Sequence, residues 1–431
     1  MRKIFTVGIL TAFSFELLAG GFQINQQSHK ATGMGGAFTG LCIDASSIFY
    51  NPGGLYKLKG HQFTGGFTLI DPHVSLQTDA NDNIDQTTGN ATPFHFYYSG
   101  QFINEKLRIG FGVNNQFGSS SSFDDDWEGR FIVQNIGLQT FMFQPTVSYA
   151  ILDEKLSIGA GFVYTAGNFH YEKGVPLASK DNEYGKATLS GSGNAMGFNV
   201  GVFSTPYKLE KEDYVFSVSV GLDYRHKLKM DLDNGNVDFT DIPSSLRDKF
   251  PESTGFTSSL TLPAVASGGI ALTYEKPEKI KVDLLYDLTR TFWSSYDTLA
   301  FDFENADTPD SKTPKNWEDV FVHRIGLNIT YKEFISIRGG IYMDQSPIPD
   351  GRVSPELPDN SHTGYTAGIG VNITDNISVD LSYLRSAFER PNASLTTEGF
   401  TASYRRIVNV YGIGINVKFG ENKTTQAPSI E

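Results

Sequence analysis

The sequence predicts an all-β fold, a transmembrane antiparallel up-and-down β-barrel of about 14 strands with an N-terminal hatch, or plug, inside the lumen. Three observations lead to this prediction. Apolar residues alternate with small or polar residues at period two along many segments. Tight turns and long polar connections follow one another in turn. Beyond residue 18, no apolar run approaches the roughly 20 residues that a spanning helix needs.

The composition narrows the class of protein. The 431 residues carry a formal net charge of −13, which speaks against a nucleic-acid binder. Charged residues make up 19%, below the roughly 25% of soluble proteins, and aromatic residues make up 13%. The mean hydropathy of −0.25 excludes a helical membrane protein. The single cysteine, Cys42, excludes an internal disulfide framework and a cysteine-ligated zinc site. A large soluble β protein or a membrane barrel remains.

The first residues have the order of a secretory signal peptide, which we place at 1–20. A short basic region at 1–3 precedes the mostly apolar stretch Ile4–Leu18, and small residues follow at 19–21. We expect cleavage near Ala19 or Gly20, and therefore export of the protein. A frayed first strand or an apolar helix is the alternative interpretation of this stretch.

Period-two alternation marks strands with two unlike faces. In 411–419, for example, large apolar residues at odd positions alternate with Gly, Asn and Lys at even positions. We expect boundaries to be uncertain by two to four residues. On this basis the predicted strands lie near 62–70, 93–103, 106–114, 140–151, 155–166, 195–204, 214–225, 264–274, 279–288, 321–331, 334–342, 364–373, 377–386 and 405–419.

The connections favour a membrane barrel over a soluble one. Tight turns fall at 104–105, 152–154, 275–278, 332–333 and 374–376. Long polar loops fall at 71–92, 115–139, 167–194, 226–263, 289–320, 343–363 and 387–404. An up-and-down membrane barrel has this rhythm, with tight turns on the periplasmic side and long loops outside. A soluble sandwich gives no reason for it, and a large soluble β-barrel is the remaining alternative.

The strand pattern assigns the two faces of the wall and calls for a plug. The row of Ile, Val, Leu and Phe meets lipid, and the row of Gly, Ser, Thr, Asn and Asp meets the lumen. A lumen of this size is too wide for side chains to fill. We therefore expect residues 21–60 to form the hatch, 61–420 the barrel and 421–431 a polar C-terminal tail. The glycines at 33–40 do not form a nucleotide loop, because the GxGxxG spacing fails and no strand precedes them.

Several motifs occur together in one order along the chain. Gly21-Phe22-Gln23-Ile24-Asn25 is followed by the glycine cluster and then by Asp44-Ala45-Ser46-Ser47 and Tyr50-Asn51-Pro52. Trp127-Glu128-Gly129-Arg130, Leu262-Pro263, Trp293-Ser294 and Arg338-Gly339-Gly340-Ile341-Tyr342 come next, and then Ser346-Pro347-Ile348-Pro349-Asp350 and Leu357-Pro358-Asp359. In this order they resemble the FadL/TodX family of outer-membrane hydrophobic-substrate transporters, over nearly the whole chain. The family's hatch motif Asn-Pro-Ala is Asn51-Pro52-Gly53 here, and the chain continues past its terminal aromatic residue Phe419.

The resemblance implies a transport function without a cofactor. It implies a monomer in the outer membrane of a Gram-negative bacterium, surrounded by lipid and lipopolysaccharide, that passes long-chain fatty acids or similar hydrophobic molecules inward. Such proteins capture substrate in an apolar groove among the outer loops, move it to an interior pocket beside the hatch and release it sideways at a kinked strand. The alternatives are an uptake channel for aromatic hydrocarbons and a general diffusion porin. A barrel enzyme or adhesin is a further function hypothesis.

Particular residues are candidates for each step. Ile242, Leu246 and Phe250 have i, i+4, i+8 spacing, which predicts one face of a short helix; with Phe256 and Leu260 they form the candidate capture groove, or else they pack on the barrel rim. Phe22 and Ile24 line or occupy the inner pocket, or else they pack the hatch. Gly110 and Gly112 are the candidate kink in the third strand, or else ordinary lumen-facing glycines.

A fatty carboxylate needs a basic partner. The face assignment places Arg338 near mid-barrel in the lumen, Arg108 lower down and Arg324 nearer the outside. An arginine in a restricted lumen can hold a carboxylate through two hydrogen bonds. A salt bridge to an inward aspartate, such as Asp283 or Asp380, is the alternative for each arginine. We predict no catalytic residue and no metal site, because the eight histidines show no ligand spacing.

Overall fold

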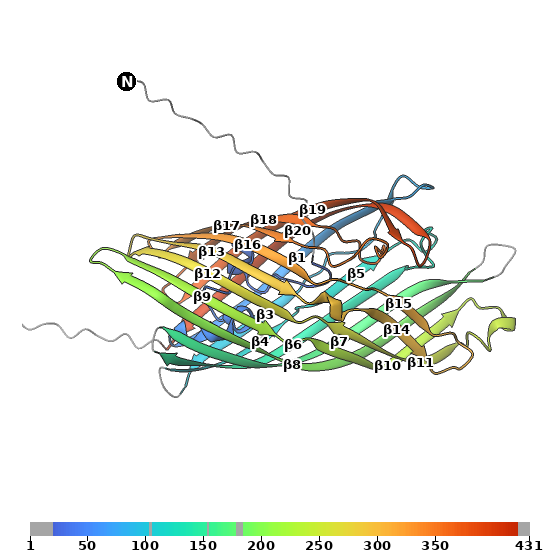
Figure 1. Cartoon of the computed structure of the whole chain (residues 1–431), viewed down its shortest axis with the longest axis horizontal. Helices are drawn as coiled ribbons and strands as arrows, with labels where there is room; N and C mark the ends of the chain where they lie inside the picture. The colour runs from blue at the N-terminus through green and yellow to red at the C-terminus, as the bar shows by residue number, and fades with distance from the viewer. Residues whose placement is uncertain (1–19, 103–105, 153–154, 178–183, 421–431) are drawn as a thin grey trace, which may run out of the picture.

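The computed structural model describes residues 20–102, 106–152, 155–177 and 184–420. The described chain forms one long barrel, with its N-terminal segment folded inside (Figure 1). The expected C-terminal tail and nearly all of the expected signal peptide lie outside the described residues.

Fourteen strands in the described part of the chain close the barrel, and each pairs antiparallel with its neighbours in chain order. The last strand closes on the first, from His61 opposite Phe419 to Gln77 opposite Ser403. The strands are β1 (His61–Gln77), β3 (Phe94–Gln101), β4 (Leu107–Asn114), β6 (Asn135–Leu152), β7 (Leu156–Pro176), β8 (Tyr184–Glu210), β9 (Val215–Arg225), β12 (Val265–Lys276), β13 (Ile280–Thr291), β16 (Val320–Tyr331), β17 (Ile335–Asp344), β18 (His362–Asn372), β19 (Ile377–Leu395) and β20 (Phe400–Phe419). The predicted fold class and strand number are confirmed.

Several strands are longer than predicted on the side of the long connections. The strand predicted at 155–166 runs to Pro176, and the one predicted at 195–204 spans Tyr184–Glu210. Antiparallel pairing continues there because cross-strand hydrogen bonds do not require apolar alternation once the register is set. The predicted long loops contain further strands: β2 (Ile84–Asp85), β5 (Gly118–Ser122), β10 (Leu228–Thr240), β11 (Ser253–Leu262), β14 (Thr298–Phe303) and β15 (Ser311–Pro314).

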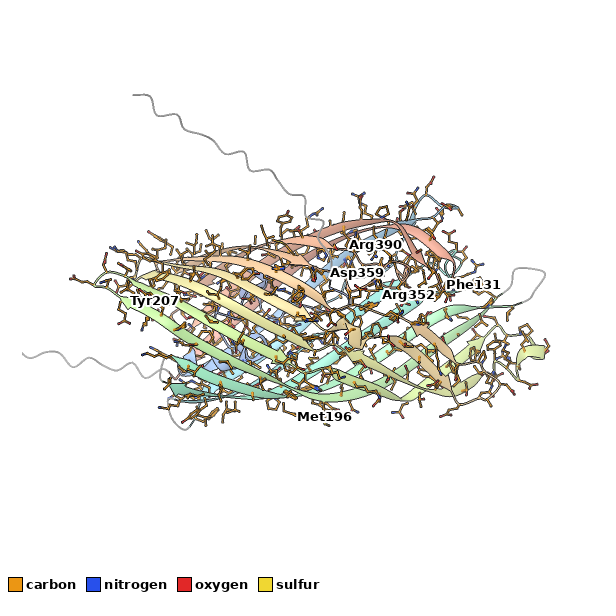
Figure 2. The ribbon with its side chains drawn as sticks, in the orientation of Figure 1. Phe131, Met196, Tyr207, Arg352, Asp359 and Arg390 are labelled. Atoms are coloured by element: carbon orange, nitrogen blue, oxygen red, sulfur yellow. The ribbon has the colours of Figure 1, made fainter. Side chains whose placement is uncertain are left out.

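The two faces of the wall are as predicted. Along β7, Ser157 and Gly159 face inward and are buried, whereas Ile158 and Phe162 face outward and are 45% and 50% exposed. Met196 also points outward, near the middle of the barrel (Figure 2). In the described part of the chain no helix has the length and apolar character to cross a bilayer. The wall therefore presents its apolar row to the surroundings.

The hatch segment, residues 21–60, occupies the lumen near the tight turns and contains α1 (His29–Gly33), α2 (Ser47–Tyr50) and the 3-10 helix η1 (Pro52–Lys57). It lies inside the left half of the barrel in Figure 1, and strands β10, β11, β14 and β15 lie toward the right. Lumen-facing glycines let the hatch backbone touch the wall. A side-chain carbon added to Gly221 would collide with the Thr39 carbonyl, and one added to Gly340 would collide with Gly35. The glycine row is thus the docking surface of the hatch.

Candidate transport site

A cavity of about 980 Å³ lies between the hatch and the outer loops. This volume is at the upper end of the roughly 300–1,000 Å³ of small-molecule pockets. Its apolar lining comes from the hatch, the wall and the loops: Phe22, Ile24, Phe117, Leu138, Phe169, Leu384, Phe388, Val408 and Val410. Its main polar groups are Arg324, Tyr342, Asp344, Asp359, His362 and Arg406.

The N-terminal end of the hatch reaches this cavity through Phe22. The Phe22 ring is buried among four aromatic rings, three of them from the connection between β13 and β16. The ring centroids lie 4.8 Å from Trp293, 5.5 Å from Tyr296, 5.8 Å from Trp317 and 6.0 Å from Phe117. Phe22 therefore fills an aromatic cage next to the cavity, and both Phe22 and Ile24 line the cavity.

The barrel wall is interrupted directly below this cage. β4 pairs with β6 as far as Asn114 opposite Met142, and pairing resumes at Gly118 opposite Gln139 on β5. Residues 115–117 thus oppose only residues 140–141, so that one extra residue breaks the ladder. The kink falls here and not at Gly110 or Gly112, which are paired in unbroken register within β4.

The structure gives a different reason for the presence of glycine at Gly110 and Gly112. A side-chain carbon on Gly110 would lie 2.7 Å from Cδ1 of Ile48, and one on Gly112 would lie 3.1 Å from Cγ2 of the same side chain. These glycines therefore make room for the hatch, which was the alternative interpretation of them. The prediction of the kink position was wrong because glycine frequency cannot separate a bend from a docking contact.

The hatch pairs with the interrupted strand. The Ile24 N–H donates to the Gln116 carbonyl at 2.7 Å, and the Gly118 N–H donates to the Phe22 carbonyl at 3.1 Å. Farther along the hatch, Gln27 Nε2 donates to the Asn115 carbonyl at 2.7 Å. The carbonyls of Asn115 and Gln116 are thus satisfied by the hatch segment 22–27, whereas Thr140 Oγ1 of β6 bonds the N–H and the carbonyl of Phe117.

The interruption leaves a gap on the other edge of β4 and β5. The Phe94 N–H donates to Asn115 Oδ1 at 3.0 Å below the gap, and the Thr87 N–H donates to the Ser122 carbonyl at 2.8 Å above it. Between these bonds no backbone hydrogen bond in the described chain joins 88–93 to 115–121. Both edges line the cavity, and so does outward-facing Phe67, which is 56% exposed. The cavity therefore opens through the wall.

The height of this gap follows from strand geometry. Phe94 lies seven residues above Gln101, which is the last residue of β3 before the turn. At about 3.3 Å per residue and a tilt of about 40°, this is roughly 18 Å above the strand end. The hydrocarbon layer is about 30 Å thick. The height of the opening above the strand end is therefore smaller than the thickness of the hydrocarbon layer.

The three candidate arginines all face the lumen as predicted, but only Arg324 lines the cavity. Arg324 is 7% exposed, and its Nη1 has no hydrogen-bond acceptor. Arg108 donates from Nε to the Leu58 carbonyl at 2.8 Å, so it supports the hatch. Burial of an unpaired guanidinium is costly unless an anion joins it. Arg324 is thus the candidate that fits a carboxylate ligand.

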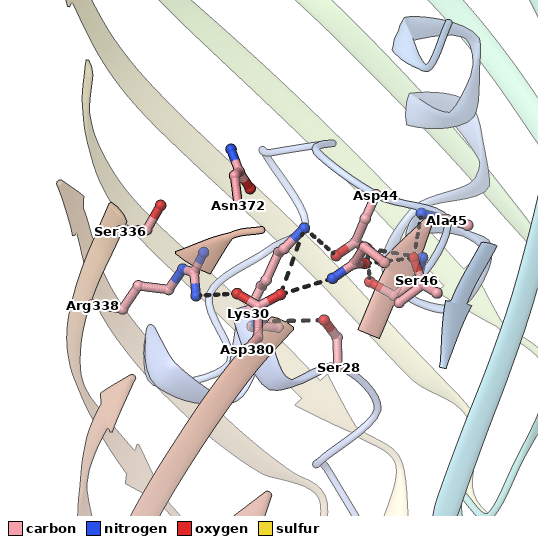
Figure 3. Close-up of polar contacts among 12 residues, drawn as sticks. Ser28, Lys30, Asp44, Ala45, Ser46, Ser336, Arg338, Asn372 and Asp380 are labelled. Carbon is pink, nitrogen blue, oxygen red and sulfur yellow. Dashed lines mark hydrogen bonds and ion pairs between the residues drawn. The ribbon is translucent and has the colours of Figure 1, made fainter. Parts of the chain in front are cut away.

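Arg338 does not line the cavity, and it forms the salt bridge to an inward aspartate that was the alternative interpretation. It pairs with Asp380 at 2.6 Å from Nη1 to Oδ1 (Figure 3). Lys30 of the hatch joins the same network, at 3.9 Å from Asp380 Oδ2 and 3.5 Å from Asp44 Oδ2. Two cations thus face two carboxylates in a buried cluster that links hatch to wall. Removing one member of such a cluster leaves an uncompensated charge.

The hatch motif Asn51-Pro52-Gly53 anchors the other side of the hatch. Asn51 Nδ2 donates to the carbonyls of Thr39 and Val202, each at 3.0 Å, and Asn51 Oδ1 accepts from the Gly53 N–H at 3.0 Å. The Gly53 carbonyl accepts from Ser157 Oγ at 2.6 Å. A side-chain carbon on Gly53 would lie 2.8 Å from the Gly201 carbonyl oxygen. The glycine in place of alanine therefore permits close contact with β8.

The predicted outer groove is a packed cluster instead. Ile242, Phe256 and Leu260 are buried, and Leu246 and Phe250 pack against the same core. The predicted helix is only one 3-10 turn, η2 (Ser244–Leu246), because Phe256 and Leu260 belong to β11 and hold the segment against β10. A second 3-10 turn, η3 (Trp293–Ser295), carries the cage residue Trp293. None of the five predicted groove residues lines the cavity.

Sequence reasoning missed several cavity residues. Arg406 has the same parity as Val408 and Val410, so the alternation of the last strand contained its inward direction. Asp344 likewise has the parity of inward Arg338 at the end of β17, beyond the predicted strand end. Asp359 and the cage residues Trp317 and Tyr296 had no such signal, because they lie in long connections whose folding depends on distant contacts.

His29 is a buried titratable group of the hatch, and its ring packs against Gly66 of β1 and Gly412 of β20. Its Nδ1 lies 3.0 Å from Ser382 Oγ, and its ring centroid lies 4.9 Å from that of His95. Burial lowers the pKa of His29 to about 4, and the carboxylates of Asp380 and Asp44 oppose this shift only in part. His29 is therefore neutral at pH 7.

The closed barrel, its apolar outer wall, the folded-in hatch and the cavity that opens sideways define a plugged transport barrel of the bacterial outer membrane. The family model described as "Outer membrane protein transport protein (OMPP1/FadL/TodX)" matches residues 10–419, and the chain belongs to this family. The protein is therefore a non-enzymatic outer-membrane transporter of hydrophobic molecules in a Gram-negative bacterium.

Relatives and solved structures agree with this assignment. The "Long-chain fatty acid transport protein" of Salmonella typhi is 25% identical, over 88% of this chain and 91% of its own length. "Outer membrane protein P1" of Haemophilus influenzae is 24% identical, over 95% and 98%. The crystal structure of a Pseudomonas aeruginosa FadL homologue has a TM-score of 0.77 at 15% identity, covering 93% of this chain and 100% of that one. The Ralstonia pickettii toluene transporter TbuX has a TM-score of 0.67 at 15% identity, covering 91% and 98%.

Proposed function

We propose that the protein carries long-chain fatty acids across the outer membrane. The molecule rests in the cavity with its carboxylate at Arg324 and leaves sideways between residues 88–93 and 115–120. The observation that carries this proposal is the continuity of one largely apolar cavity from a buried guanidinium, whose Nη1 has no acceptor, to an opening in the wall.

The apolar lining supplies the driving force for the chain of the fatty acid. Phe22, Ile24, Leu384 and Val408 form part of that lining. Each methylene group that leaves water for such a surface gains about 0.8 kcal/mol. An open polar pore offers no comparable gain. A general diffusion porin is therefore the weaker interpretation, because the hatch also fills the lower lumen.

The charge at Arg324 separates the two remaining substrate classes. A carboxylate can accept two hydrogen bonds from a guanidinium, and the low dielectric of a buried site strengthens them. An aromatic hydrocarbon would leave Arg324 Nη1 buried without an acceptor, with the charges of Asp344 and Asp287 acting on it only from a distance. Relatives named for fatty acids and structures named for toluene both match this chain, so this local chemistry supports the fatty acid.

We assign substrate capture and substrate exit to two different parts of the cavity wall. Capture falls to the outer connection 345–361, whose Leu357 and Pro358 line the cavity, and not to the packed cluster around Phe256. Exit falls to the gap beside β4 and β5. The chain acts as a monomer among outer-membrane lipid and lipopolysaccharide, because its last wall strand pairs with its first and closes the barrel without a partner chain.

Binding of labelled oleate to the purified protein tests this proposal. Arg324→Met keeps the length of the side chain and removes the charge. We expect it to weaken oleate binding about 10- to 100-fold, the value of a charge-assisted hydrogen bond of about 1.5–3 kcal/mol. Arg324→Lys should lose less, and binding of toluene should not weaken in either variant.

The matched control is Arg385→Met, because Arg385 is an exposed arginine on the same barrel. It should bind oleate as the unaltered protein does. Equal oleate affinity in Arg324→Met and the unaltered protein would contradict the carboxylate assignment. Tighter binding of toluene than of oleate by the unaltered protein would favour the aromatic-hydrocarbon channel.

A further inference from the structure

A separate groove of about 410 Å³ lies on the outward face of the barrel wall. It runs over β12, with β9 on one side and β13 on the other, three strands that pair side by side (Figure 1). It shares no lining residue with the transport cavity. The strands β6 and β7 separate its β8 edge from β4, which borders the lateral opening. The groove is therefore distinct from the transport cavity and from the proposed exit.

The groove forms because two small residues of β12 lie between taller neighbours. Ala266 and Gly268 have the outward parity of β12, and a side-chain carbon added to Gly268 would meet only Leu222, at 3.3 Å from its Cδ2. The register places Gly268 between Leu222 of β9 and Leu288 of β13. Both neighbours line the groove with aliphatic carbon. In a bilayer, packing against such a surface favours an extended acyl chain.

The upper end of the groove carries a charge. On β13 the outward residues, every second one from Ile280 to Leu288, are apolar or aromatic, and the next outward residue is Arg290. Arg290 lies opposite Ala266 in the register and lines the groove. The long connection to β16 begins directly after this strand, on the side away from the tight turns. Arg290 therefore marks the outer boundary of the apolar face.

The guanidinium of Arg290 is held in place but keeps free donors. Its Nη2 donates to Asp319 Oδ2 at 3.0 Å, and its central carbon lies 4.9 Å from the ring centroid of Phe292 and 5.5 Å from that of Phe321. The side chain is 46% exposed. Within the described chain its Nε and Nη1 make no hydrogen bond. A guanidinium has five N–H donors, so most of them can still bind an anion.

We propose that this groove is a binding site for one molecule of lipopolysaccharide, with an acyl chain along Gly268 and a phosphate group at Arg290. Lipopolysaccharide fills the outer leaflet of a Gram-negative outer membrane, and its lipid A anchor carries phosphate groups above several acyl chains. Arginine binds phosphate through two parallel hydrogen bonds. A phospholipid has a similar chemistry, but it belongs to the leaflet at the other end of the wall strands. This inference does not depend on the identity of the transported substrate.

Native mass spectrometry of the purified, delipidated protein in detergent tests the site. The whole barrel is titrated with lipid A, with lipid A from which the phosphate groups have been removed, and with phosphatidylglycerol. We expect one molecule of lipid A to bind more tightly than either of the other lipids. Loss of the phosphate groups should weaken binding at least about tenfold, the value of a charge-assisted hydrogen bond.

Two pairs of variants make the test specific. Gly268→Leu fills the groove and Arg290→Met removes the charge, and each should weaken lipid A binding at least about tenfold. Gly339→Leu adds the same side chain to an outward glycine of β17 that has open space around it, and Arg385→Met removes an exposed arginine of β19. Both control variants should bind lipid A as the unaltered protein does. All four variants should bind oleate normally, which checks that each one is folded.

Three results would overturn the proposal. The first is equal lipid A affinity in each altered protein and its control. The second is equal binding of lipid A with and without its phosphate groups. The third is binding of phosphatidylglycerol as tight as that of lipid A, which would assign the groove to a phospholipid.

Discussion

The ring of Phe22 meets the indole of Trp293 edge to face, with 4.8 Å between their centroids. This contact joins the N-terminal end of the hatch to the connection between β13 and β16. Phe22 is 7% exposed and Trp293 is fully buried. Because the carbonyl of Phe22 also pairs with Gly118, one residue closes both the aromatic cage and the wall interruption.

Phe22→Ala should loosen the plug. Removal of a buried phenylalanine costs about 3–5 kcal/mol of packing, so the segment 22–27 should leave its place more often. We expect a higher leak conductance in planar bilayers than for the unaltered protein. Phe334→Ala is the control, since Phe334 is 58% exposed, and it should leave the conductance unchanged. An unaltered leak in Phe22→Ala would show that the ring does not close the path.

Deletion of Gln116 should close the lateral opening. It leaves two residues opposite 140–141 on β6, so the ladder of β4 can continue into β5. We expect oleate binding to persist while oleate uptake by cells falls to the level without the protein. Deletion of Asp79, an exposed loop residue, should preserve uptake. Normal uptake after deletion of Gln116 would mean that substrate leaves by another route.

Asn51→Ala should weaken the anchorage of the hatch. It leaves the buried carbonyl of Thr39 and the carbonyl of Val202 without the donor Nδ2. Each lost partner of this kind costs about 1–3 kcal/mol. We expect faster proteolysis within 21–60 in detergent, with the barrel itself intact. Asn83→Ala, at an exposed loop residue, serves for comparison, and equal proteolysis of the two variants would argue against the assigned role.

His29 should make the stability depend on pH in a defined window. Its pKa is about 4 in the folded protein, because burial disfavours the charged form, against 6.5 ordinarily. The unfolded chain therefore binds the proton first, and stability is complete above pH 6.5 and falls as the pH drops toward 4. A difference of this size corresponds to about 3 kcal/mol.

The urea midpoint at pH 7 and pH 4.5 measures this effect. His29→Gln cannot ionise and should show a smaller loss at pH 4.5 than the unaltered protein. His73→Gln should keep the full loss, since the His73 side chain is 65% exposed. An identical pH dependence in His29→Gln and the unaltered protein would assign the loss to other groups.

The inward direction of the site arginines was predictable, and their partners were limited only to inward aspartates such as Asp283 or Asp380. Period two alone places Arg324, Arg338 and Arg108 in the lumen, because neighbouring side chains on a strand point to opposite faces. Which of them faces a cavity depends on where the hatch ends, and the hatch has no alternation to position it. The choice of Asp380 over Asp283 as the partner of Arg338 likewise required the register of β17, β18 and β19.

The sequence by itself determined the barrel, its fourteen strands and its two faces, since these depend on local alternation and on the lengths of connections. Only the tertiary structure decided the wall interruption at 115–117, the aromatic cage of Phe22 and the outward groove at Gly268. Each of these arises where segments far apart in the chain meet. A one-residue mismatch between strands and a contact between a hatch and a loop leave no periodic trace in the sequence.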